Sequence, residues 1–511
     1  MTTALPRGGR GVLALVVAAA ALLLPFLGAR ELRNPDEPRD SEIGREHADG
    51  GWTVVPRLNG APYHSKPPLY FASVGLAMRA SGSQDAAVAR ATAALYGVAT
   101  AVATGLAAEA LLGAGTGLLA GLLLLGMPWV HARFRTSTTD AGLAALVAVS
   151  MMLLLRAHRD GSLAAWLGGG AAAGLAGLAK GLHGLLLPFL ALALLLALRR
   201  DGATLRRPGL WLALLAGAGV FGAWVAALHA IPEAGGGPEA VDALLYGNIA
   251  KRFGERAHHQ GSPWHYVVIA AAALPWTPLA LAGALVAARR AEPERERLLG
   301  PFAWVVAILV ALTAASGKRT VYLLPLMPGV ALLAAGAVDA AARGALGPRL
   351  DATVRWTVAA MALPLVPFGA RRWDLRVRAA AAALVAAGSV AFDAWIAPRE
   401  NATASGRVLA ERAVAVAGDR PLVLFRVGQG DLGQFLFPLR RTLPAAWDES
   451  ELRAAAAGRP VLVLAERSKV DEARAEGPSR GLSAAAADAL RPVESGVAGG
   501  TEYTLWEWDG R

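Results

Sequence analysis

Residues 11–29 read GVLALVVAAAALLLPFLGA, and residues 34–42, shortly after this apolar run, read NPDEPRDSE. The first stretch has the length and composition of a helix that crosses a bilayer. The second stretch gathers four carboxylates and one arginine at the membrane surface. Carboxylates beside fixed cations suit a reaction in which a hydroxyl is activated and an anionic leaving group departs. The two stretches together predict a membrane enzyme, not a simple membrane anchor.

The composition of the whole chain is that of an integral membrane protein. Of its 511 residues, 55% are hydrophobic and only 17% are charged, which is too apolar for a soluble chain. Apolar runs long enough to cross a bilayer lie at 11–29, 86–111, 115–132, 138–155, 162–179, 182–198, 210–230, 265–288, 299–315 and 321–342. We expect further spans between 352 and 397, which gives an all-α polytopic protein with about 12–13 transmembrane helices.

The first apolar run also has features of a cleaved signal peptide, because Arg7 and Arg10 precede it. Its length and the many spans that follow favour a retained helix. The arginines near 156–159, 199–207 and 289–297 fall on the same side as Arg7 and Arg10 when the spans alternate. Arginine marks the cytoplasmic side. The long segments 30–85 and 231–264 are therefore expected on the outer face.

Lysine is rare in this chain. Five lysines occur among 50 basic residues, and four of them, Lys66, Lys180, Lys251 and Lys318, fall at predicted outer ends of spans. Because positive charge is normally depleted on that side, we interpret the four as a cluster that binds phosphate, although a lysine at a helix end can also simply reach the interface. The net charge of +11 is mostly arginine on the inner side, so nucleic-acid binding has no support.

Metal and redox chemistry receive little support from the sequence. The chain has no cysteine, which excludes disulfides and thiolate metal sites. His258 and His259 are adjacent in the second outer segment and could join a carboxylate in holding a divalent metal. Their spacing matches no zinc pattern. A divalent metal is thus possible, and no cofactor is certain.

The character of the chain changes near residue 398. Residues 1–397 form the predicted transmembrane domain, and residues 398–511 are more polar and form a predicted small α/β domain. Strand-like runs lie at 421–427, 460–465 and 501–508, and alanine-rich helical stretches lie at 402–417 and 483–490. Its sequence shows no recognisable group of catalytic residues. We expect it on the outer face, although an even number of spans would return it to the cytoplasm.

Several segments resemble one family of enzymes in their order along the chain. They are DEPR at 36–39, PRLNG at 56–60, KPPLY at 66–70, LAKG at 178–181, KRF at 251–253, HHQ at 258–260 and SGKR at 316–319 with Tyr322. In combination they resemble the polyprenyl-phosphate-sugar-dependent glycosyltransferases of GT-C fold. Within that family, the bacterial aminoarabinose transferases of lipid A and the protein O-mannosyltransferases are the most similar. The resemblance covers most of the membrane part.

The resemblance implies a mechanism and a location. A sugar would pass, with inversion, from polyprenyl (undecaprenyl) monophosphate to a lipid A, glycolipid or protein acceptor at the periplasmic face of the bacterial inner membrane. Asp36 would act as the base, with Glu37 as the second member of the acid pair. The residues implied to bind the donor phosphate are Arg39, Lys66, Lys180, Arg252, Lys318 and Arg319, and those implied to bind substrate are Arg57, His258, His259 and Tyr322.

Three points stay open at the level of sequence. Ser65 stands before Lys66, where the lipid A enzymes usually carry glutamate, so no metal or amino-sugar contact is inferred there. Asp36 and Glu37 could instead stabilise the N-terminus of a short helix that begins near Pro38. A transporter or flippase for a lipid-linked or anionic substrate is the alternative function, although a transporter usually holds its charges near the middle of the bilayer.

Overall fold

The computed structural model describes residues 7–33, 35–51, 53–247, 261–289, 293–362 and 405–510, together with 387–388, 390–391, 394–395, 399 and 401. The chain divides into two compact units. The first unit comprises Met1–Phe26, His64–Tyr70 and Arg90–Phe392, and the second comprises Leu27–Tyr63, Phe71–Ala89 and Asp393–Arg511. The segment after the first apolar run therefore packs with the C-terminal region, which is distant in the sequence.

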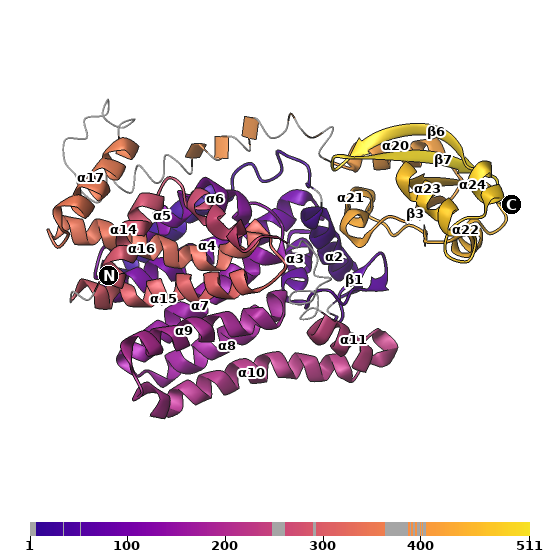
Figure 1. Ribbon diagram of the computed structural model, residues 1–511. Coiled ribbons are helices and arrows are strands. Elements are labelled where there is room, and N and C mark those ends of the chain that lie inside the picture. The colour runs from indigo at the N-terminus through magenta and orange to yellow at the C-terminus, as the bar shows by residue number, and fades with distance from the viewer. Residues whose placement is uncertain are drawn as a thin grey trace, which may run out of the picture. The chain divides into compact units, whose positions relative to one another are not determined.

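Helices account for most of the described part of the first unit (Figure 1). They are α1 (Arg7–Leu23), α4 (Ala86–Leu112), α5 (Thr116–Leu125), α6 (Pro128–Phe134), α7 (Thr139–Asp160), α8 (Leu163–Lys180), α9 (Leu182–Arg199), α10 (Pro208–His229), α11 (Pro238–Asp242), α13 (Ile269–Ala272), α14 (Thr277–Ala288), α15 (Glu294–Ala314), α16 (Met327–Ala342) and α17 (Pro348–Ala362). Among the described residues, six helices are long and apolar enough to cross a membrane, or up to eight if each of two bent pairs is one span. The prediction of an all-α polytopic membrane protein is confirmed.

Two of the predicted spans are broken. The run predicted at 115–132 forms α5 and α6, which meet at an angle of 81°, and the run predicted at 265–288 forms a bent pair with an angle of 114°. Proline explains where the breaks fall, because it lacks the N–H that would continue a helix. Pro128 begins α6, and Pro275 lies between α13 and α14. Most of the spans predicted between 352 and 397 lie outside the described residues.

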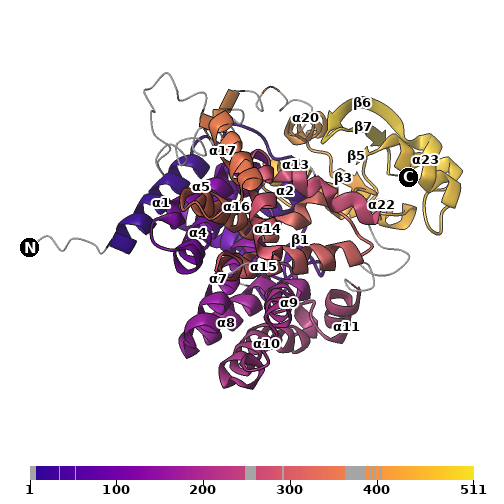
Figure 2. The same cartoon turned by 60° about the vertical axis from the view of Figure 1, so that its left-hand side comes forward.

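Helices α8, α9 and α10 run side by side in both views (Figures 1 and 2). Glycine allows α8 and α10 to approach closely. A Cβ atom on Gly174 would lie only 2.6 Å from the carbonyl oxygen of Gly217 in α10, and one on Gly217 would lie 2.8 Å from that of Gly170. Small residues that let helix backbones meet are typical of packing within a membrane. This seam shows that glycines near residues 168–177 serve helix packing.

The C-terminal part of the second unit is an α/β domain, as predicted. Its helices are α20 (Arg407–Ala417), α21 (Gln429–Leu439), α22 (Glu449–Ala456), α23 (Arg467–Glu476) and α24 (Ala484–Ala489). Its strands are β3 (Leu422–Phe425), β4 (Ala445–Ala446), β5 (Val461–Ala465), β6 (Arg491–Ala498) and β7 (Thr501–Trp508), in the order β4-β3-β5-β7-β6. Strand β3 pairs in parallel with β4 and β5, whereas β7 pairs antiparallel with β5 and β6.

The sequence predicted three of these five strands. Strands β3 and β5 are buried along their whole length, so they read as short continuous apolar runs. Strand β6 was missed because it is an edge strand with the exposed sequence RPVESGVA, and an edge strand needs no apolar alternation. The two residues of β4 are too few to leave a pattern.

The second unit also contains the segment that follows the first apolar run. Helix α2 (Asp36–Gly50) begins this segment, and the two-residue strands β1 (Arg57–Leu58) and β2 (Ala61–Pro62) form a small hairpin after it. Most of α3 (Leu69–Ser81) belongs to the same unit and packs on α2 through glycine. A Cβ atom on Gly75 of α3 would lie 2.9 Å from the Cβ atom of His47 in α2.

Candidate active site

Helix α2 is the centre of the candidate site. Its sequence, DEPRDSEIGREHADG, is strongly polar, yet Glu37, Asp40, Glu42, Arg45 and His47 are all buried. Buried charges are tolerated only where they are paired or hydrogen-bonded. The helix begins with Asp36 and Glu37 in its first turn, where negative charge stabilises the exposed N–H groups. The N-cap position is Pro35, whose side chain makes no capping hydrogen bond.

Asp36 is held by Arg39. The Arg39 guanidinium donates to Oδ1 of Asp36 at 2.6 Å and to Oδ1 of Asp40 at 2.9 Å, and it lies 6.0 Å from the centre of the Tyr63 ring. Asp40 has no exposed side-chain surface, whereas 17% of the Asp36 side chain is exposed. Asp36 is therefore the carboxylate of this trio that a substrate can reach, and Arg39 holds it in position.

Glu37 has different surroundings from Asp36. Its carboxylate accepts hydrogen bonds from Arg30 at 2.8 Å and from the backbone N–H of Arg33 at 2.9 Å, and its side chain is 1% exposed. These contacts tie the chain that enters α2 to the first turn of the helix. The arrangement suits a residue that fixes the loop more than one that exchanges protons with a substrate.

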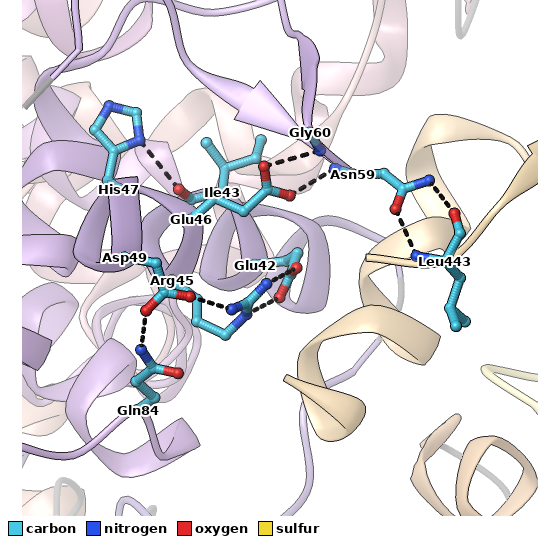
Figure 3. Close-up of polar contacts among 10 residues, drawn as sticks. All are labelled: Glu42, Ile43, Arg45, Glu46, His47, Asp49, Asn59, Gly60, Gln84 and Leu443. Carbon is cyan, nitrogen blue, oxygen red and sulfur yellow. Dashed lines mark hydrogen bonds and ion pairs between the residues drawn. The ribbon is translucent and has the colours of Figure 1, made fainter. Parts of the chain in front are cut away.

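A second buried ion pair follows one turn later (Figure 3). Arg45 donates to both carboxylate oxygens of Glu42, at 2.8 and 2.7 Å, and also bonds Asp49 at 2.5 Å. The amide of Gln84 donates to the other oxygen of Asp49 at 2.6 Å. Burial raises the pKa of Glu42 to about 7, although Arg45 opposes that shift. The next carboxylate along the helix, Glu46, also has a raised pKa because of burial.

Glu46 connects α2 to the hairpin. Its two oxygens accept the backbone N–H groups of Asn59, at 2.6 Å, and Gly60, at 3.0 Å. The guanidinium of Arg57, a predicted substrate-binding residue, donates to the Gly60 carbonyl at 2.8 Å, and the residue is half-buried. Arg57 thus closes the hairpin turn in this structure.

Asn59 links the same hairpin to the C-terminal domain (Figure 3). Its side-chain amide donates to the carbonyl of Leu443 at 2.8 Å and accepts the N–H of Leu443 at 2.9 Å. The residue has a φ of 57°, a conformation that asparagine tolerates better than most residues do. This pair of hydrogen bonds joins positions 384 residues apart in the sequence.

Helix α21 of the C-terminal domain packs directly on the first turn of α2. A Cβ atom on Gly433 would lie 2.5 Å from the Cα atom of Arg39, closer than real side chains ever approach. A Cβ atom on Gly430, one turn earlier, would lie at an ordinary 3.5 Å from Pro35. The backbone of Arg39 is therefore positioned by a glycine that only the tertiary structure brings to it.

In the first unit, Lys180 forms a buried ion pair with Asp140. Only 7% of the Lys180 side chain and 6% of the Asp140 side chain are exposed. The Lys180 ammonium also lies 5.1 Å from the centre of the Tyr322 ring, which is close enough for a cation–π contact. Two of the predicted residues, Lys180 and Tyr322, are thus neighbours, and Asp140 is a partner that the sequence analysis missed.

Lys318 lies at the C-terminal end of α15. Its ammonium donates to the carbonyls of Leu312 at 3.0 Å, Thr313 at 2.6 Å and Ala315. Three carbonyls match the three donors of an ammonium group, and a lysine in this position caps the negative end of the helix. Burial lowers the pKa of Lys318. In this structure the residue acts as a helix cap beside the Tyr266 ring, 5.4 Å away.

The remaining predicted residues fall in three places. Lys66 lies in the turn before α3, and Arg319 directly precedes the turn of 3₁₀ helix Thr320–Leu326. Arg252, His258 and His259 lie outside the described residues. Within the described residues, no group of three or more His, Asp or Glu side chains could hold a metal ion.

The predicted site residues that the structure describes are divided between the two units. Asp36, Glu37, Arg39 and Arg57 are in the second unit, and Lys66, Lys180, Lys318, Arg319 and Tyr322 are in the first. That both groups line one cavity stays a prediction. The buried partners Asp40, Glu42, Arg45 and Asp140 were missed, although the three-residue spacing of Glu42 and Arg45 on a helix is a signal that could have identified that pair.

Comparison with known proteins agrees with this architecture. Residues 65–226 match the model of a family described as dolichyl-phosphate-mannose-protein mannosyltransferase. The structure superposes on the crystal structure of ArnT from Cupriavidus metallidurans bound to undecaprenyl phosphate with a TM-score of 0.75, at 22% identity and over 97% of each chain. The chain has the fold of ArnT. The predicted GT-C fold is confirmed.

Sequence relatives point to the same group. An undecaprenyl phosphate-alpha-4-amino-4-deoxy-L-arabinose arabinosyl transferase from Aeromonas salmonicida is 31% identical over 327 residues, which cover 62% of this chain and 58% of the relative. One from Sodalis glossinidius is 33% identical over 331 residues, 61% of this chain and 56% of the relative. The match thus spans less than two thirds of the length of these relatives. The chain is similar to ArnT-like glycosyltransferases, as the motifs predicted.

Proposed function

We propose that this protein is a glycosyltransferase that takes a sugar from undecaprenyl monophosphate and transfers it to a lipid A or other acceptor on the outer side of the bacterial inner membrane. The observation that carries the proposal is the combination of the ArnT fold over nearly the whole chain with an accessible carboxylate, Asp36, at the start of α2. The sequence relatives, named for transfer of aminoarabinose from undecaprenyl phosphate, supply the class of donor.

In the proposed reaction, Asp36 removes the proton from the acceptor hydroxyl as the hydroxyl oxygen attacks the anomeric carbon of the sugar. The bond from that carbon to the phosphate oxygen breaks, and undecaprenyl phosphate leaves as the anion. A single in-line displacement inverts the anomeric configuration. Arg39 orients the Asp36 carboxylate before the reaction, and a general base must be positioned in this way.

The cations have distinct proposed roles. Lys66, Lys180 and Arg319, with Arg252, stabilise the negative charge that develops on the leaving phosphate. Lys180 is held ready by Asp140 and Tyr322. Lys318 contributes by capping α15 next to Arg319, and Glu37 contributes by fixing the loop before Asp36.

The test uses the full-length protein in lipid nanodiscs with undecaprenyl phosphate-linked aminoarabinose and lipid A. Asp36→Asn should lower the transfer rate at least 100-fold while the melting temperature stays within a few degrees of the parent. Glu411→Gln is the matched control, because Glu411 is an exposed carboxylate that also pairs with an arginine. Transfer by Asp36→Asn at the parent rate would remove Asp36 as the base.

The identity of the sugar is tested with the same preparation. Activity with the aminoarabinose donor but not with undecaprenyl phosphate-linked mannose or glucose would place the protein with its sequence relatives. Turnover with none of these monophosphate donors, together with turnover of an undecaprenyl diphosphate-linked sugar, would contradict the proposed donor class.

A further inference from the structure

An apolar groove lies between α9 and α10, at the ends of these helices that are joined by residues 200–207. Its volume is about 530 Å³, which is within the range of ligand-binding cavities. One wall is formed by α9 from Phe189 to Ala197, and the other by Leu210, Trp211 and Leu214 of α10. The connecting segment closes one end with Arg200 and Asp201.

The packing of the helices explains why the groove is present. The glycine seam described above draws α10 onto α8. Near Gly217, side chains of α9 also reach α10, because a Cβ atom there would lie 2.9 Å from Leu185 and 3.5 Å from Phe189. Beyond that point, toward the connecting segment, α9 and α10 carry Ala193, Ala197 and Leu210 on the walls of the groove. Small side chains on α9 leave the space unfilled.

The length of the groove matches one leaflet of a bilayer. From Phe189 to Arg200, α9 rises roughly 16 Å, and half of the hydrocarbon core of a bilayer is about 15 Å thick. The apolar walls would therefore lie beside acyl chains, and Arg200 would lie at the level of the lipid headgroups. Trp211, 56% exposed on the rim, is the residue type that prefers that level.

The closed end of the groove is positively charged. The segment from Arg199 to Arg207 contains four arginines and one aspartate. Arg199 pairs with Glu296 at 2.6 Å, and the Asp201 carboxylate accepts two hydrogen bonds from Thr204, at 3.0 and 2.6 Å.

Arg200 and Arg206, by contrast, are exposed. Arg200 ends α9 with a φ of 55°. Within the described part of the chain, neither guanidinium has an ion-pair partner.

We propose that this groove binds one anionic phospholipid, with an acyl chain along α9 and the headgroup phosphate on Arg200. An apolar groove as long as one leaflet accommodates a single extended acyl chain, and a guanidinium binds a phosphate through charge-assisted hydrogen bonds. Basic sites between transmembrane helices favour anionic over zwitterionic lipids. This inference does not depend on the transferase activity, since no residue of the candidate active site lines the groove.

Native mass spectrometry of the full-length, delipidated protein tests the proposal. The probes are phosphatidylglycerol and phosphatidylcholine with identical acyl chains. Phosphatidylglycerol should bind about fivefold more tightly, and Arg200→Ala should remove most of that preference. Arg156→Ala is the matched control: Arg156 is also an exposed arginine at the end of a transmembrane helix, but pairs with Asp160 at 3.2 Å, and its loss should leave the preference intact.

A second variant tests the groove itself. Ala193→Trp fills the space between the helices and should weaken the binding of both phospholipids at an unchanged melting temperature. Equal binding of the two lipids by the parent protein, or a preference that survives Arg200→Ala, would overturn the role of Arg200. Binding that survives Ala193→Trp would overturn the groove as the site. Displacement of phosphatidylglycerol by an equimolar amount of undecaprenyl phosphate would overturn a phospholipid as the occupant.

Discussion

Replacing Gly433 by alanine tests one contact of the C-terminal domain, the close packing of α21 against the first turn of α2. Gly433 lies in the middle of α21, where alanine is intrinsically the better helix former by about 1 kcal/mol. The added methyl group would, however, lie 2.5 Å from the Cα atom of Arg39. An ordinary contact between carbon atoms needs about 3.5 to 4 Å. The backbone of one helix must therefore move by about 1 Å.

The expected cost follows from that displacement. Adding a methylene to a well-packed interface destabilises a protein by typically 1–3 kcal/mol, which here outweighs the gain in helix propensity. Because Arg39 bonds Asp36 at 2.6 Å, a shift of about 1 Å should also lower the rate of sugar transfer by about 100-fold. The melting temperature should fall by several degrees.

Gly430→Ala is the matched control for Gly433→Ala. Gly430 lies on the same helix and faces Pro35 at 3.5 Å, so the methyl group fits and the gain in helix propensity should remain. The assay measures melting temperature and transfer rate for both variants in the same nanodiscs. If Gly433→Ala were as stable and as active as Gly430→Ala, the close packing of α21 on α2 would be refuted.

Three further predictions concern buried polar contacts. Because burial raises the pKa of Glu42 from 4.5 to about 7, its contribution to stability is complete below pH 4.5 and is lost as the pH rises through 7. This loss is roughly 3–4 kcal/mol, since each pKa unit corresponds to about 1.4 kcal/mol. Glu42→Gln should therefore flatten the dependence of melting temperature on pH between 4.5 and about 7; an unaltered profile would argue against Glu42 as its source. Asn59→Ala removes both hydrogen bonds to Leu443 and should lower the free energy of unfolding by about 1–3 kcal/mol. Limited proteolysis should then release the C-terminal domain faster than in the parent protein, and an equal rate of release would contradict this prediction. Asp140→Ala leaves Lys180 without its buried carboxylate and should destabilise the protein by about 3–5 kcal/mol, whereas a double variant with Lys180→Met should recover most of that loss in a thermal melt.

The candidate site was only partly predictable, for a physical reason. Motifs identify residues whose side-chain chemistry suits phosphate or a hydroxyl, and they singled out Asp36 and Lys180, whose roles stay predictions. Motifs do not show what each side chain touches. Glu37 and Lys318 also have the predicted chemistry. In the structure the Glu37 carboxylate accepts the N–H of Arg33, and the Lys318 ammonium donates to carbonyls at the end of α15. Asp140 stands within an apolar run and carries no motif.

The sequence by itself determined the membrane helices, the three central strands of the C-terminal domain and the kind of chemistry at the start of α2, because hydrophobic length, alternation and charge are local properties of the chain. Only the tertiary structure decided which distant residues support α2. The Asn59 amide meets Leu443, and the backbone of Arg39 meets Gly433, across nearly 400 residues. Such contacts depend on how two surfaces fit, and a single sequence does not record that fit.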